Sequence, residues 1–289
     1  MDIPHVRLPD GTLLPAIGQG TWHLGEGRKA RRDEVDALIH GLDRGLKVID
    51  TAEMYGNGGS EEVVGEALKQ RRDDAFLVTK MLPGNTGHNN IVSACERSLR
   101  RLQTDVIDLY LLHWRGAYPL EAVMESFGHL RDEGKIRYFG VSNLDIGDMK
   151  ELRGTQLGRE CVTNQVLYHL ASRGIEFSLR PSMARWEMPL MAYSPLAQHM
   201  GKSHQSLHRD SVLTDIAAHR NASVEQILLA WVIRPYQGHH TTLAIPKATS
   251  IEHIDDNADA MTMVLTDHEL ALLDEAFPAP KQKVPLDLI

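Results

Sequence analysis

Residues 50–56 read Asp50-Thr51-Ala52-Glu53-Met54-Tyr55-Gly56 and directly follow the apolar run Leu46-Lys47-Val48-Ile49. A buried strand that ends on a carboxylate and then turns over a tyrosine presents reactive groups at its carboxyl end. Two later apolar runs end in the same way, one at Lys80 and the other at His113. The spacings of 30 and 33 residues are each about the length of one βα unit. The pattern predicts three neighbouring parallel strands that hold an acid, a lysine and a histidine at one edge.

Further apolar runs alternate with helical patterns along the chain, and no linker interrupts them. Eight parallel strands with helices between them predict an α/β fold, a (β/α)8 or TIM barrel. We expect a single domain over residues 1–289, with an N-terminal β-hairpin around Pro9-Asp10-Gly11 and a short C-terminal tail after Phe277. Ser60 is expected to cap a helix that runs to Gln70. The strand candidates are 17–22, 46–49, 76–79, 106–112, 136–141, 161–166, 190–193 and 241–245, and the main helix candidates are 28–44, 60–70, 89–101, 120–133, 212–220 and 223–234.

Charge and composition limit the classes of partner. The formal net charge of −8 argues against nucleic acid or a membrane surface, whose binding proteins carry basic patches. The N-terminus lacks a basic region followed by an apolar stretch, and no run is long enough to span a bilayer, so we expect a cytoplasmic protein. We also expect it to be a monomer. Cys95 and Cys161 form no Cys-x-x-Cys pair and are expected to be buried thiols. The histidines at 199, 204 and 208 match no compact ligand pattern, so we expect no metal site.

The remaining strand ends carry polar side chains that suit a nucleotide. Ser142 and Asn143 follow one strand, and Gln165 lies in the next. Amide groups of this kind can pair with a carboxamide, and the flat ring of Tyr193 can stack on a heterocycle. Lys247 supplies a point charge for a phosphate group. Because active sites of such barrels lie at the carboxyl ends of the strands, these residues are expected to share one pocket with Asp50, Lys80 and His113.

These motifs, in this order, resemble those of the aldo-keto reductases over nearly the whole chain, and the short loops and tail resemble the smaller bacterial members. The matching segments are Asp50-Thr51-Ala52-x-x-Tyr55-Gly56, Gly140-Val141-Ser142-Asn143, Asn164-Gln165, Tyr193-Ser194-Pro195-Leu196 and Ile245-Pro246-Lys247. The resemblance implies NADPH-dependent reduction of aldehydes and ketones to alcohols. It also implies a catalytic tetrad of Asp50, Tyr55, Lys80 and His113, and a substrate pocket that includes Trp22 and Trp114. The cofactor contacts that it implies are Gly20, Thr21, Trp22, Asp50, Ser142, Asn143, Gln165, Tyr193, Ser194, Leu196, Lys247, Ala248, Thr249, Ser250, His253, Asp256 and Asn257.

The reduction of a carbonyl group requires an acid, and this requirement gives each residue of such a tetrad a role. Hydride delivery to a carbonyl carbon leaves negative charge on oxygen, so an acid must protonate it, and a phenol with an ordinary pKa near 10 is weak for this task. A nearby lysine favours the phenolate, so Lys80 is expected to lower the pKa of Tyr55. Asp50 would compensate the buried ammonium. His113 would orient the carbonyl oxygen by donating from a neutral ring.

Two other interpretations remain open. Residues 25–30, Gly25-Glu26-Gly27-Arg28-Lys29-Ala30, match the G-x-G-x-x-A pattern of a Rossmann fold, although Trp22-His23-Leu24 separate them from the preceding strand. A barrel of this family could also serve as a cofactor-sensing subunit with slow turnover. Each tetrad residue taken alone would more often be structural, and Trp22 and Trp114 would ordinarily be core aromatics.

The cofactor's 2′-phosphate is the point at which the sequence departs from the family pattern. After Ile245-Pro246-Lys247 the resemblance would lead us to expect a serine and a phosphate-binding arginine, but the chain has Ala248 and His253. NADPH should still be preferred over NADH, because Lys247 remains to bind the phosphate. The phosphate should be bound more weakly than by an arginine, because an imidazole offers one donor and titrates near pH 6.5. The short loops also predict small substrates such as methylglyoxal and compact aromatic aldehydes rather than steroids.

Overall fold

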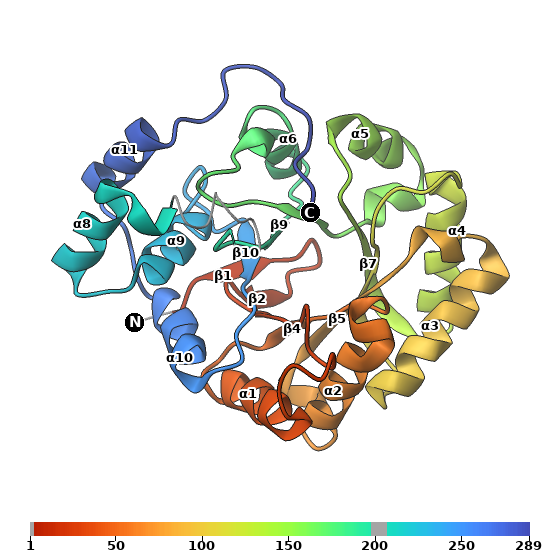
Figure 1. Ribbon diagram of the computed structural model, residues 1–289. Helices are drawn as coiled ribbons and strands as arrows, with labels where there is room; N and C mark the ends of the chain where they lie inside the picture. The colour runs from red at the N-terminus through yellow and green to blue at the C-terminus, as the bar shows by residue number, and fades with distance from the viewer. Residues whose placement is uncertain (1–2, 198–206) are drawn as a thin grey trace.

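The chain forms a (β/α)8 barrel, seen along its axis in Figure 1, a computed structural model that describes residues 3–197 and 207–289. Eight parallel strands follow one another in sequence order around the sheet. Short parallel contacts join its two ends, with the amide of Gly20 donating to the carbonyl of Pro246 at 2.9 Å. The strands are β3 (Gln19–Gly20), β4 (Val48–Asp50), β5 (Phe76–Met81), β6 (Ile107–Leu112), β7 (Ile136–Ser142), β8 (Asn164–Leu167), β9 (Leu190–Tyr193) and β10 (Thr242–Ile245).

Helices surround the strands because each carries an apolar stripe that is buried only against the barrel. Strand β6 is buried along its whole length, as is expected of a parallel strand covered on both faces. The helices named in Figure 1 are α1 (Arg31–Asp43), α2 (Gly59–Leu68), α3 (His88–Leu102), α4 (Leu120–Asp132), α5 (Ile146–Gly154), α6 (Leu179–Arg185), α8 (Ser211–Arg220), α9 (Val224–Val232), α10 (Ile251–Ala260) and α11 (Asp267–Ala276).

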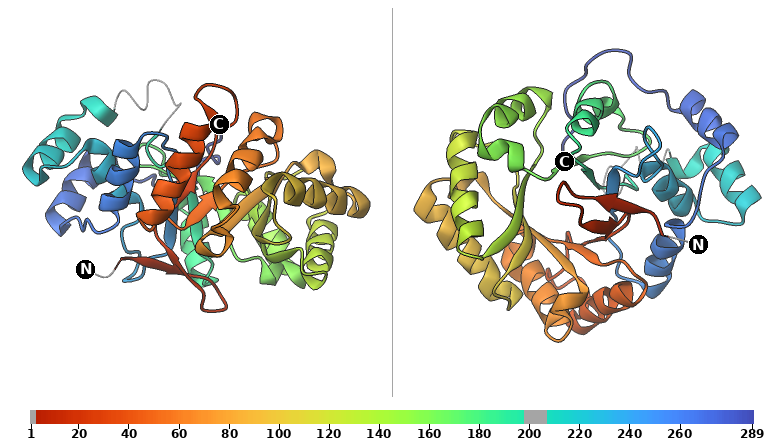
Figure 2. Two further views of the ribbon diagram at one scale, coloured as in Figure 1. Left: turned by 90° about the horizontal axis from the view of Figure 1, so that it is seen from below. Right: turned by 180° about the vertical axis from the view of Figure 1, so that it is seen from behind.

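An N-terminal hairpin covers the amino-terminal end of the barrel, as the Pro-Asp-Gly turn predicted. Strands β1 (His5–Arg7) and β2 (Leu13–Pro15) pair antiparallel, with Val6 opposite Leu14. Both side chains are buried against an apolar cluster that includes Val48 at the start of β4. The right-hand view of Figure 2 shows this hairpin across the centre of the barrel. The carboxyl ends of the strands are therefore the open side.

The C-terminal tail crosses to that open side. Lys283 donates to the Asp145 carboxylate at 2.6 Å, and Ser172 donates to Asp287 at 2.5 Å. The tail therefore ends near the barrel axis, where Figure 1 marks the C-terminus, and Ile289 lines the central pocket. Tertiary contacts thus fold the short tail inward, so that its last residue contributes to the pocket lining.

Several local expectations also need correction. Ser60 does not cap α2, since the helix begins after Gly58, whose φ of +93° suits glycine, and the Ser60 hydroxyl instead donates to Thr21 Oγ1 at 2.7 Å. The sixth strand starts at Asn164 rather than three residues earlier. The Rossmann interpretation is wrong, because residues 25–30 form the loop before α1 of a barrel.

Both cysteines are free and buried. Within the described residues, none of the helices has the length and apolar character to cross a membrane.

Candidate active site

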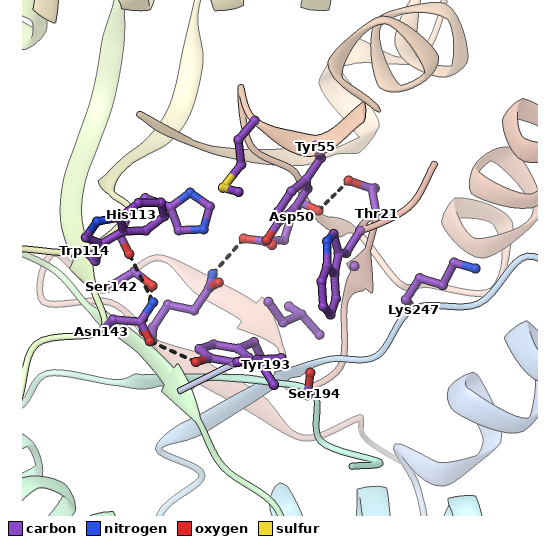
Figure 3. A pocket seen from close by; sticks show the side chains of 16 residues that line it. Thr21, Asp50, Tyr55, His113, Trp114, Ser142, Asn143, Tyr193, Ser194 and Lys247 are labelled. Carbon is purple, nitrogen blue, oxygen red and sulfur yellow. Dashed lines mark hydrogen bonds between the residues drawn. The ribbon is translucent and has the colours of Figure 1, made fainter. Parts of the chain in front are cut away.

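Three adjacent strands, β4, β5 and β6, and the loops that follow them place the predicted tetrad together. Asp50 ends β4, and Lys80 lies near the end of β5, which pairs with β4 in parallel register. Tyr55 begins the single 3₁₀ turn after β4, and His113 follows β6. Figure 3 shows Asp50, Tyr55 and His113 at the wall of one pocket. The sequence prediction of acid, lysine and histidine at one edge is confirmed by this arrangement.

Asp50 and Lys80 form a buried ion pair. The Lys80 ammonium lies 2.6 Å from Asp50 Oδ2, with the side chains 0% and 2% exposed, respectively. It also donates to the Thr51 carbonyl at 2.8 Å, and Gln165 Nε2 donates to Asp50 Oδ1 at 2.7 Å. Burial alone would lower the pKa of Lys80, but the charges and hydrogen bonds of Asp50 and Tyr55 raise it above its ordinary value. The lysine is therefore held as a fixed cation at neutral pH.

The Lys80 ammonium also contacts the hydroxyl group of Tyr55. Lys80 Nζ lies 3.4 Å from the phenol oxygen and 4.9 Å from the ring centroid. Burial is the largest influence and raises the pKa of Tyr55, while the Lys80 charge opposes it and Asp50 adds to it. The expected lowering by Lys80 is thus present, but burial outweighs it. The phenol is protonated at neutral pH, which is the state an acid requires.

His113 is neutral in this environment. Its side chain is 8% exposed, and burial, followed by the charge of Lys80, lowers its pKa to about 3. Its ring meets that of Tyr55 edge-on, with centroids 5.8 Å apart. A neutral imidazole beside the phenol can donate a hydrogen bond to a carbonyl oxygen without competing as a general acid.

Amide and hydroxyl groups line the neighbouring wall. Asn143 has a left-handed φ of +59°, which asparagine tolerates, and its amide donates to the His113 carbonyl at 3.1 Å. The Tyr193 hydroxyl donates to Asn143 Oδ1 at 2.9 Å, and Ser142 donates to the Gln165 carbonyl at 2.9 Å. These bonds fix the wall before any ligand arrives.

One pocket therefore contains most of the predicted site. Lys80 is fully buried in its contact with Asp50 and is outside the lining, as are Leu196 and the predicted residues after Lys247. Three lining residues, Met54, Ile245 and Ile289, were not predicted; the first two adjoin motif residues, but no local signal marks Ile289. The lining consists of Gly20, Thr21, Trp22, Asp50, Met54, Tyr55, His113, Trp114, Ser142, Asn143, Gln165, Tyr193, Ser194, Ile245, Lys247 and Ile289.

The expected phosphate contacts lie in the loop and first turns after Lys247. Ser250 caps α10 by accepting from the His253 amide at 3.3 Å. His253 itself is exposed. Lys247 is half-buried at the end of the pocket opposite Trp114 (Figure 3). The remaining predicted contacts in this region are Ala248, Thr249, Asp256 and Asn257, of which only Asn257 is fully buried.

Metal ligation has no support from the described part of the chain. In residues 3–197 and 207–289, no group of three or more His, Cys, Asp or Glu side chains is placed to hold an ion. Of the histidines considered above, His199 and His204 lie outside the described residues, and His208 lies 3.6 Å from the Glu225 carboxylate.

The barrel and its Asp50–Lys80–Tyr55 arrangement define a class of carbonyl-reducing oxidoreductases, and the chain belongs to the Aldo/keto reductase family, which matches residues 16–277. It is 51% identical over 284 residues to the methylglyoxal reductase YeaE of Escherichia coli (strain K12), covering 98% of each chain. It is 32% identical to the glyoxal reductase of Bacillus subtilis (strain 168), and the match covers 93% of this chain and 91% of that protein. An aldo-keto reductase from Klebsiella pneumoniae crystallised with NADPH aligns over 100% of both chains, with a TM-score of 0.96 and 51% identity.

Proposed function

We propose that the protein reduces small aldehydes and ketones, with α-oxoaldehydes such as methylglyoxal foremost and compact aromatic aldehydes also accepted, using NADPH. The observation that carries this proposal is the phenol of Tyr55, protonated and 3.4 Å from a buried lysine that is itself neutralised by Asp50. The similarity to a methylglyoxal reductase, a glyoxal reductase and an NADPH-bound reductase supports it.

The residues of the pocket fit such a cofactor. The half-buried ring of Tyr193 offers a flat surface for the nicotinamide, and Ser142, Asn143 and Gln165 place amide and hydroxyl groups beside it. Lys247 lies at the far end, and α10 begins four residues later, so a cation and a helix N-terminus would be available to hold the phosphates. When bound, NADPH would supply the hydride.

Tyr55 then protonates the oxygen of the substrate. As its proton leaves, the phenolate is stabilised by the ammonium of Lys80, which Asp50 holds at 2.6 Å and cannot move without breaking a buried ion pair. His113 donates to the same oxygen and orients the carbonyl carbon. Charge therefore develops where a fixed cation already lies.

The mouth of the pocket favours small substrates. Trp22, Met54 and Trp114 line it together with Ile289 of the tail. Met54 and Trp114 are 42% and 38% exposed, so an apolar rim surrounds the reacting groups. A planar two- or three-carbon aldehyde, or a single aromatic ring, suits this rim better than a steroid.

Steady-state oxidation of NADPH with a panel of carbonyl compounds tests the proposal. We expect kcat/KM for methylglyoxal and nitrobenzaldehyde to exceed that for a steroid ketone. Higher kcat/KM for the steroid would contradict the substrate class. Tight NADPH binding with no turnover of any compound would instead favour the cofactor-sensing subunit.

A further inference from the structure

The loop between β3 and α1 reaches across the barrel seam to the segment after β10. Lys29 Nζ donates to the Thr249 carbonyl at 3.1 Å, although the two residues are 220 positions apart. The start of the loop is closely packed, since a Cβ on Gly25, whose φ is +73°, would lie 2.3 Å from the carbonyl carbon of Gly59. The Gly25 amide also donates to Glu34 of α1 at 2.9 Å. Lys29 itself lies in the exposed part of the loop, and its bond to Thr249 joins that part to the segment after β10.

Positive charge gathers at this end of the pocket. Burial, and then the charges of Lys29 and Arg28, lower the pKa of Lys247, while the carboxylates of Glu34 and Glu26 partly oppose this shift. Arg28 is already paired with Glu26 at 2.9 Å. Lys29 is exposed and, among the residues that the structure describes, forms no ion pair with a carboxylate. One of its N–H groups contacts Thr249, so the others can still bind an anion.

The segment that Lys29 contacts is the one in which the family pattern holds the cofactor's 2′-phosphate. Ser250 begins α10, whose N-terminal amides favour an anion. The guanidinium expected at position 253 is replaced by His253, which is exposed and outside the pocket lining. A phosphate group near Thr249 would therefore lack its usual second cation on this segment.

We propose that Lys29, from the β3–α1 loop, supplies this second cation and grips the 2′-phosphate together with Lys247. The inference rests on the proposed use of NADPH and identifies a residue that sets its preference over NADH. A 2′-phosphate carries close to two negative charges at pH 7, and two ammonium groups on opposite sides of the seam match that charge. The grip thus comes from a distant part of the chain.

Binding measurements with purified full-length protein test the assignment. Dissociation constants for NADPH and NADH are measured by tryptophan fluorescence quenching in the wild type, Lys29→Met, Lys29→Arg and Lys150→Met. We expect Lys29→Met to weaken NADPH binding about five- to twentyfold, as for loss of one charge-assisted contact at an exposed site, and to leave NADH binding unchanged. Lys29→Arg should restore the NADPH affinity. Lys150→Met, an equal charge change on α5 across the ring in Figure 1, should match the wild type.

A second probe isolates the phosphate group. Calorimetry with adenosine 2′,5′-bisphosphate and adenosine 5′-monophosphate should show that Lys29→Met weakens only the first. Equal loss for NADPH and NADH would indicate that Lys29 merely holds the loop, and no loss would exclude it from the phosphate site. Loss of discrimination in His253→Ala but not in Lys29→Met would also overturn the assignment. If the wild type itself binds NADH as tightly as NADPH, the proposed cofactor is wrong instead.

Discussion

Lys80 donates to Asp50 at 2.6 Å in a site where neither side chain is more than 2% exposed. This single contact links stability to chemistry, because the carboxylate compensates a buried ammonium and the ammonium faces the phenol of Tyr55. Loss of either partner should destabilise the fold, since a buried charge without its partner is strongly destabilising. Changes at any of the three residues should therefore have distinct signatures.

Tyr55→Phe should abolish carbonyl reduction and preserve NADPH affinity, because the lost hydroxyl acts on the substrate oxygen. A fall in kcat of about 10²–10⁴-fold is expected for loss of a general acid. Stopped-flow turnover and fluorescence binding separate the two effects. Tyr138→Phe is the control, since its hydroxyl donates to Asp10 in the hairpin at the other end of the barrel. Retention of more than about a tenth of the turnover would remove Tyr55 from the role.

Lys80→Met should lower the free energy of unfolding by about 3–5 kcal/mol, because it leaves the Asp50 carboxylate buried with Gln165 as its main donor. The double change Asp50→Asn with Lys80→Met should recover most of that loss. Urea unfolding followed by circular dichroism measures both. Arg31→Met breaks a half-exposed pair with Glu66 and should cost no more than about 1 kcal/mol. Additive losses in the double variant would show that the two charges are not coupled.

His113 should make the protein less stable in acid. Its pKa is about 3 in the folded protein and near 6.5 when unfolded, so above pH 6.5 both states are neutral and it contributes no slope. As the pH falls from 6.5 toward 3, only the unfolded chain binds the proton, and the free energy of unfolding decreases by up to about 1.4 kcal/mol per pH unit. His113→Gln should lose this slope, as measured by unfolding between pH 7 and 4.

The same neutral histidine predicts that kcat has no inflection near pH 6.5. Burial lowers the pKa of His169 to about 4, so this residue also makes the protein less stable in acid. Its contribution is the same in the wild type and in His113→Gln, and it cancels when their stability profiles are compared. Parallel stability profiles for the wild type and His113→Gln would mean that His113 is solvated and titrates normally.

Ile289→Ala should widen the pocket mouth. The side chain lines the pocket, and the tail that carries it is held by the 2.5 Å contact between Ser172 and Asp287. We expect the ratio of kcat/KM for nitrobenzaldehyde over methylglyoxal to rise about three- to tenfold, a modest effect for removing a few carbons from an apolar contact. Leu288→Ala is the matched control, because its side chain is similarly exposed, 60% against 55% for Ile289, but is outside the pocket lining. An unchanged ratio in Ile289→Ala would exclude the tail from substrate selection.

The sequence by itself determined the barrel and the reactive cluster. Alternation of apolar runs and amphipathic segments is set by near neighbours, and parallel strands must bring their carboxyl ends to one edge. Asp50, Lys80 and His113 could therefore be placed together from their spacing alone, and Tyr193 and Lys247 from the same rule.

Tertiary structure alone decided the features that depend on segments far apart in the chain. The tail turns inward and places Ile289 in the pocket lining. Lys29 donates to the carbonyl of Thr249, 220 positions away, and Ser60 donates to Thr21 instead of capping its helix. The direction of the Tyr55 pKa shift belongs with these, because burial depends on what every surrounding segment covers. None of these features produces a periodic pattern in the neighbouring sequence, so they cannot be predicted from the sequence alone.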